Sequence, residues 1–127
     1  YSYSLSEESL ELSKKVNALV YQKLQRGKGN SPFSAITKYP RVEDYYGGEG
    51  LPGTTLASFS MNGAAVMLYE VSAIGQKKNG MLTRQSYIGI WETLLGLANG
   101  EIYEVDPDSY DEIPEAGPRI SNPRPRI

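Results

Sequence analysis

Two residue types that carry much of protein chemistry, cysteine and histidine, are absent from this chain of 127 residues. Without cysteine there can be no disulfide, no thiolate zinc site and no cysteine nucleophile. Without histidine the chain lacks the commonest general base and the commonest metal ligand. We therefore expect no metal and no cofactor, and any catalysis has to use Glu, Asp, Lys, Arg, Tyr, Ser or Thr.

Strong charge and long apolar runs are missing as well. The net charge is −2 at pH 7, which argues against nonspecific binding of nucleic acid by overall charge, although a local basic patch remains compatible with it. No apolar run approaches the ~20 residues that a membrane-spanning helix needs, so we expect no membrane partner. The length predicts a single domain over 1–127 with one modest core. The composition leaves the cellular compartment open.

Phenylalanine and tryptophan are scarce, whereas tyrosine is abundant: two Phe and one Trp stand against ten Tyr. Tyrosine combines a flat apolar ring with a polar tip, and this suits surfaces that recognise other proteins. Half-buried strands also favour tyrosine, so the same abundance is compatible with a purely structural role.

A long amphipathic helix is predicted over residues 5–26. Ser4 and Glu7 have the spacing of a capping box at its start, and Gly27 is a suitable residue to end it. Apolar residues recur at helical spacing and define the face that we expect to be buried. These residues are Leu5, Leu12, Val16, Leu19, Val20 and Leu24.

Three Asn-Gly pairs punctuate the middle of the chain, at 62–63, 79–80 and 99–100. Asn-Gly favours type I′ turns, in which both central residues have positive φ, and such turns join antiparallel strands. The sequence therefore predicts an α+β fold, in which one long N-terminal helix packs on an antiparallel β-meander of three to four strands over 54–105. Residues 91–97 favour helix more than strand, so a short helix is the alternative there.

Two segments outside the predicted meander are rich in turn-forming residues. Residues 27–53 form a long glycine-rich loop, and loops of this length are commonly functional or ordered by a partner. Residues 106–127 are first acidic and then basic with regularly spaced prolines, which predicts an extended arm. This arm is either a solvated tail or a segment that docks on another chain. The basic residues that would make the contact are Arg119, Arg124 and Arg126.

One carboxylate interrupts the most apolar stretch of the predicted sheet. In the register set by the 79–80 turn, Glu70 lies opposite Gly89, and Tyr87 and Trp91 are its diagonal neighbours. A carboxyl group in a partly apolar setting has a raised pKa, as a general acid or base requires. The alternative is an ordinary glutamate on the solvated face of a sheet.

The first functional hypothesis is a non-enzymatic protein–protein interaction module, such as an inhibitor, an immunity-type partner or an assembly subunit. It would bind another protein chain through the free sheet face, the 27–53 loop and the C-terminal arm. Aromatic residues and arginine dominate the binding energy of protein interfaces. The predicted anchors are Tyr45, Tyr46, Trp91 and the three arginines of the arm.

The second hypothesis is a metal-independent, histidine-free ribonuclease of toxin type, with RNA as its partner. RNA cleavage needs a base for the 2′-hydroxyl and an acid for the leaving oxygen. Glu70 would be the base and Tyr87 the proton donor. This hypothesis depends on analogy at the level of the predicted fold.

Overall fold

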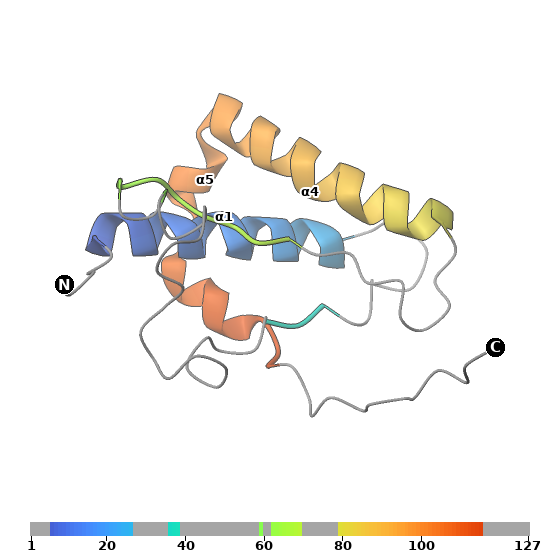
Figure 1. Ribbon diagram of the computed structural model, residues 1–127, viewed down its shortest axis with the longest axis horizontal. Helices are drawn as coiled ribbons and strands as arrows, with labels where there is room; N and C mark the ends of the chain where they lie inside the picture. Colours follow the sequence, from blue (N-terminus) through green and yellow to red (C-terminus); the bar gives the residue numbers. More distant parts are fainter. Residues whose placement is uncertain (1–5, 27–35, 39–58, 60–61, 70–78, 116–127) are drawn as a thin grey trace.

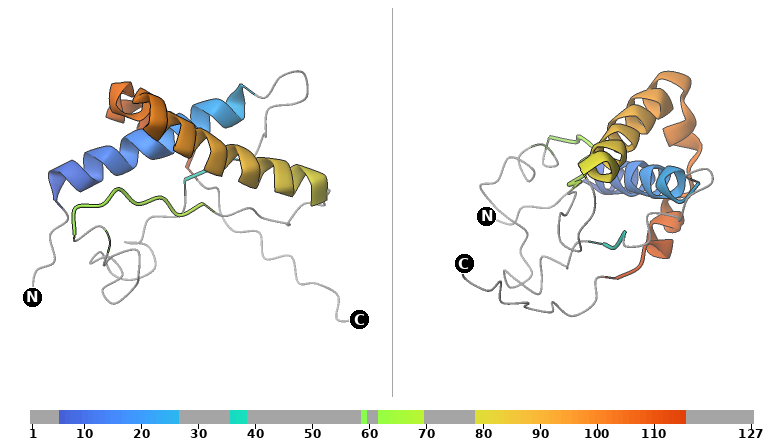
Figure 2. Two further views of the ribbon diagram at one scale, coloured as in Figure 1. Left: turned by 90° about the horizontal axis from the view of Figure 1, so that it is seen from above. Right: turned by 90° about the vertical axis from the view of Figure 1, so that its right-hand side faces the viewer.

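The computed structural model describes residues 6–26, 36–38, 59, 62–69 and 79–115. Helix α1 spans Glu7–Gln25 and helix α4 spans Asn79–Asn99. The short helix α5, Glu101–Glu104, follows at once, and the 3-10 helix η1 spans Pro107–Glu112. Helix α1 lies between α4 on one side and η1 on the other (Figure 1). Helix α4 crosses α1 obliquely (Figure 2).

No β-strand occurs in the part of the chain that the structure describes, so the predicted α+β fold with an antiparallel β-meander is wrong. The clearest correction concerns α4, a helix of 21 residues that occupies the positions predicted as a returning strand. It includes the 91–97 stretch, for which helix was the alternative. Leucine, which favours helix, is its commonest residue, at four of the 21 positions.

The Asn-Gly pairs explain why the prediction failed. Asn62-Gly63 does make a turn, with Gly63 at φ 81°. Asn99-Gly100 instead ends α4, with Gly100 at φ 79° in the left-handed region. Asn79-Gly80 begins α4. A left-handed glycine serves both a hairpin turn and the end of a helix, so the dipeptide alone does not distinguish the two.

Helix α1 confirms the predicted N-terminal helix. Its N-cap is Ser6, whose side chain accepts a hydrogen bond from the Ser9 backbone N–H at 3.1 Å. The capping box predicted from Ser4 is therefore wrong by two residues. Glu7 and Glu8 lie in the first turn and Lys23 in the last, where their charges favour the helix dipole.

The core forms where the apolar face of α1 meets α5 and the 64–69 segment. Val16, Leu19 and Ile102 are its buried centre, and burying a side chain of this size contributes about 1.5–3 kcal/mol before entropy is counted. The predicted inward face of α1 is confirmed from Leu12 to Leu24, although its partner is not a sheet, and Leu5 lies outside the described residues. The residues packed around the centre are Leu12, Ala65, Met67 and Val105.

A row of polar side chains on α1 binds the backbone of the 64–69 segment. The Ser9 hydroxyl donates to the Ala64 carbonyl at 2.6 Å. The Val66 N–H donates to Ser13 Oγ at 2.9 Å, and Asn17 Nδ2 donates to the Val66 carbonyl at 3.4 Å. Ser9, Ser13 and Asn17 are spaced four residues apart, so they line one side of the helix. Their side chains satisfy backbone groups that a neighbouring strand would satisfy in a sheet.

The extended arm predicted over 106–127 is partly wrong. Residues 107–112 form η1, which Asp106 caps by accepting from the Asp108 N–H at 3.0 Å. Beyond η1, Ile113 is buried, and the Lys38 N–H donates to the Pro114 carbonyl at 2.7 Å. The basic part of the predicted arm lies outside the described residues, as does the 27–53 loop except for residues 36–38.

Candidate interaction surface on α4

Helix α4 comes closest to the rest of the molecule at two of its glycines. Gly89 and Gly96 are both buried and lie about two turns apart on one face. A Cβ atom at Gly96 would lie 2.6 Å from Leu19 Cδ2 and 2.9 Å from Ile102 Cγ1. One at Gly89 would lie 3.0 Å from Tyr69 Cε1. The backbone of α4 therefore approaches its neighbours as closely as glycine alone allows.

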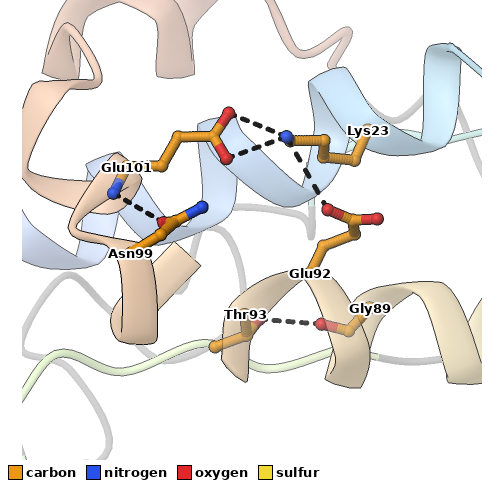
Figure 3. Close-up of polar contacts among 6 residues, drawn as sticks. All are labelled: Lys23, Gly89, Glu92, Thr93, Asn99 and Glu101. Atoms are coloured by element: carbon orange, nitrogen blue, oxygen red, sulfur yellow. Dashed lines mark hydrogen bonds and ion pairs between the residues drawn. The ribbon is translucent and has the colours of Figure 1, made fainter. Parts of the chain in front are cut away.

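A lysine from α1 holds the end of α4 and the start of α5 (Figure 3). Lys23 Nζ lies 2.7 Å from Glu101 Oε1 and 3.7 Å from Glu92 Oε2. The hydrogen bond from Lys23 lowers the pKa of Glu101 below its ordinary value. The Asn99 side chain accepts from the Glu101 N–H at 2.9 Å, within the same cluster. Glu92 is the residue of this cluster that lies in the middle of α4, so its ion pair with Lys23 links that side of α4 to α1.

Tyr69 fixes the position of the 64–69 segment on α4. Its ring lies against Gly89, and its hydroxyl donates to the Gln85 backbone carbonyl at 3.0 Å. Burial raises the pKa of Tyr69 above its ordinary value. Gln85 is itself buried. The residues of α4 that are fully buried are therefore Gln85, Gly89 and Gly96.

The opposite face of α4 carries large apolar side chains that are exposed to solvent. We call this set the apolar stripe: Tyr87, Ile90, Trp91, Leu94 and Leu97, exposed by 59, 63, 50, 58 and 48 %. The first four recur at the i, i+3, i+4 and i+7 spacing that places residues on one side of a helix. Tyr87 and Trp91 stack on each other with ring centroids 6.0 Å apart and planes within 9°.

A shallow groove of about 230 Å³ runs along one edge of the apolar stripe. Ile90 and Leu94 of the stripe form one wall, and Met67 and Tyr69 of the neighbouring segment form the other. Its floor is Gly89 and Thr93, whose hydroxyl donates to the Gly89 carbonyl at 2.7 Å. That bond turns the Thr93 hydroxyl away from the groove toward the helix backbone, so the groove is apolar.

The structure assigns new surroundings to some of the predicted site residues. Tyr87 and Trp91, predicted on a sheet face, lie one turn apart on α4 and both belong to the apolar stripe. Glu70, the predicted catalytic base, lies outside the described residues. The remaining predicted binding residues also lie outside them: Tyr45, Tyr46, Arg119, Arg124 and Arg126.

The sequence interpretation missed three members of the stripe: Ile90, Leu94 and Leu97. The helical spacing from Tyr87 to Leu94 was the signal that would have found them. It was hidden because two-residue alternation between Ile88 and Ile90 also fits a strand.

The described residues contain no group of three or more acidic side chains placed to hold a metal ion. All buried side-chain nitrogen and oxygen atoms of this part of the chain have hydrogen-bond partners. No described helix has both the length and the apolar character needed to cross a membrane. Among the described helices, α4 carries the most exposed large apolar side chains.

Comparison with known proteins finds no match for the chain: no family model, no curated protein and no solved structure is significantly similar to it. The interpretation of its function therefore depends on the geometry of α4.

Proposed function

We propose that this chain is a non-enzymatic protein–protein interaction module that binds its partner through the apolar stripe of α4. One observation supports the proposal above all: α4 directs large apolar side chains outward and Gly89 and Gly96 inward. Contiguous exposed apolar patches of a few hundred Å² commonly mark interaction sites. Burying each of these side chains on a partner would contribute about 1.5–3 kcal/mol before the costs of association.

The composition of the stripe supports the same proposal. Tyrosine and tryptophan dominate the energetic centres of protein interfaces, where charged residues are depleted. The stripe contains the stacked pair Tyr87 and Trp91 and no charged residue. Only Arg84 and Glu92 are charged along the whole of α4, and Glu92 is directed toward Lys23.

The shape of the surface favours a helix as the bound element. An exposed apolar face on a straight helix, bordered by a groove, is complementary to the apolar face of an amphipathic helix. The groove between Ile90 and Met67 has room for an apolar side chain from such a helix. The predicted sheet face takes no part in this proposal, since the described residues form no sheet.

The ribonuclease hypothesis stays a prediction, because Glu70 lies outside the described residues. Tyr87, its predicted proton donor, stacks on Trp91 in the apolar stripe and is exposed. Chelator-resistant cleavage of total RNA that is lost in Glu70→Gln and in Tyr87→Phe would displace the interaction module as the function.

A helical peptide library tests the proposal, because selection from it needs no identified partner. The library displays amphipathic helical peptides whose apolar residues are randomised, and peptides that bind the wild-type chain at low concentration are selected. Fluorescence anisotropy then measures the Kd of each selected peptide. We expect peptides whose Kd is weakened at least about tenfold by Ile90→Arg, because losing one buried side chain of this size costs about 1.5–3 kcal/mol.

The matched control is Leu10→Arg, which changes a similarly exposed apolar residue, 48 % exposed, on α1. It should leave peptide binding unchanged, and circular dichroism should show that both variants keep their helices. Selection of peptides that bind Ile90→Arg as well as they bind the wild type would contradict the proposal.

A further inference from the structure

We propose that the partner of the apolar stripe is a second copy of this chain, with the two α4 helices packed antiparallel about a twofold axis near Trp91. This inference rests on the proposed function, since it names the partner of the same surface. It is supported by the area of the stripe and by the placement of charge along α4.

The exposed area of the stripe fits a small symmetric dimer. Its five side chains are about half exposed or more, and an aromatic side chain offers about 150–250 Å². The stripe therefore offers on the order of 600 Å² per copy, or roughly 1,200 Å² for two, at the lower limit of specific interfaces. A second stripe is complementary to the first in length and in its lack of charge.

The spacing of the stripe allows an antiparallel register that pairs apolar residues with apolar residues. With Trp91 on the twofold axis, Tyr87 lies level with the partner's Leu95, next to Leu94 of the partner's stripe. Residues seven apart on one helix lie about 10 Å apart along its axis. The stripe thus covers two to three turns of contact.

Charge favours the antiparallel over the parallel arrangement. Arg84 is exposed, and it is the one cationic residue of α4. The last turn of α4 carries no basic residue to offset the negative end of the helix dipole. In the antiparallel register, Arg84 lies beside the partner's Ala98, at that negative end. In a parallel pair the two Arg84 side chains would lie side by side and repel each other.

A lipid surface is the less favoured partner. Helices that lie on membranes expose an opposite face rich in lysine and arginine to water. The face of α4 opposite the stripe is instead buried against Leu19, Ile102 and Tyr69. A single arginine on the helix also offers little attraction to anionic headgroups.

Pairwise cross-linking tests the arrangement directly, because the chain has no cysteine of its own. Arg84→Cys and Ala98→Cys are prepared as two separate proteins, and one of them carries a tag that changes its mass. Each protein is oxidised by itself, and a mixture of the two is oxidised as well. The antiparallel dimer predicts a strong tagged–untagged disulfide in the mixture and little in either variant alone, since bridging needs Cα atoms within about 7 Å. Leu10→Cys measures the background from random collision.

Sedimentation equilibrium of the wild-type chain should give twice the 14.0 kDa chain mass at high concentration, and Ile90→Arg should weaken the dimer at least tenfold. Self-linking of each cysteine variant would overturn the antiparallel arrangement. A wild-type monomer at every concentration, or a dimer that Ile90→Arg leaves intact, would overturn the inference.

The two proposals fail in different ways. A monomer that still binds selected helical peptides through the stripe would leave the proposed function standing and remove only the second copy as partner. A monomer whose Trp91 fluorescence shifts to the blue on neutral phosphatidylcholine vesicles, and that selects no peptide, would remove both and assign the stripe to lipid.

Discussion

Helices α1 and α4 pack on each other but bury different kinds of residue. Helix α1 turns Val16, Leu19 and Leu24 inward, as amphipathic helices ordinarily do. Helix α4 turns Gly89 and Gly96 inward and leaves Leu94 and Trp91 exposed. The contact between them therefore joins an apolar face of one helix to a bare backbone face of the other.

The difference shows that size as well as hydrophobicity decides which face of a helix is buried. The side chains of Leu19 and Ile102 occupy the space that a Cβ at Gly96 would take. The buried apolar area at this contact thus comes from α1 and α5, and the close approach of the α4 backbone increases van der Waals contact. The apolar residues of α4 are then free to serve another surface.

Replacing a leucine by alanine should change the unfolding free energy much more in α1 than in α4, and this is the largest difference that we expect. Leu19→Ala should cost about 2–5 kcal/mol of unfolding free energy, because Leu19 is 1 % exposed and its loss leaves a cavity. Leu94→Ala, at a residue 58 % exposed, should cost less than about 0.5 kcal/mol. Urea unfolding of dilute protein measures both. Equal costs would show that the stripe belongs to the core of the single chain.

A substitution at Gly96, which is buried in α4, should have the next largest effect on stability. Gly96→Leu should lower the unfolding free energy by about 1–3 kcal/mol, since its side chain meets Leu19 and Ile102, which are both buried. Gly80→Leu is the control, because a Cβ at Gly80 meets nothing within 4 Å and leucine favours helix over glycine. In thermal unfolding, the Tm of Gly96→Leu should be lower than that of the wild type, and the Tm of Gly80→Leu should be equal to it or higher. The opposite ranking would contradict the close packing.

The contact between Lys23 and Glu101 should have the smallest effect, visible as a change in pH dependence. The folded-state pKa of Glu101 is lowered, so its contribution to stability is present above the unfolded pKa of glutamate and is lost as the pH falls through the lower folded value. Glu101→Gln should therefore reduce the loss of stability on acidification. The control is Glu104→Gln in the same short helix, and an identical acid profile for both variants would argue against the assignment.

Some of this structure follows directly from the sequence. The spacing of Leu12, Val16 and Leu19 predicts α1 and its buried face, because helical period and core burial coincide there. Trp91 was predicted as a binding anchor and Tyr87 as a proton donor, and the structure places both of them, exposed, in the apolar stripe.

The rest was hidden for physical reasons. Left-handed glycine at position 100 has the same backbone requirement in a hairpin as at the end of a helix. The fully buried residues of α4 give no apolar signal, since Gly89 and Gly96 lie too close to Tyr69 and Leu19 to carry a side chain. The 64–69 segment was predicted as a strand, yet the groups that bind its backbone are side chains of α1. Such tertiary contacts are invisible to local patterns.

The binding of this segment by Ser9, Ser13 and Asn17 has a consequence for the solubility of the chain. Residues 64–69 read Ala-Ala-Val-Met-Leu-Tyr, a short uncharged run of the kind that assembles into fibrils when its amide groups are available to other molecules. The carbonyl groups of Ala64 and Val66 and the N–H of Val66 are already occupied by the helix. We therefore expect these three hydrophilic residues of α1 to reduce aggregation, because the backbone groups that they bind are not available for strand pairing with another molecule.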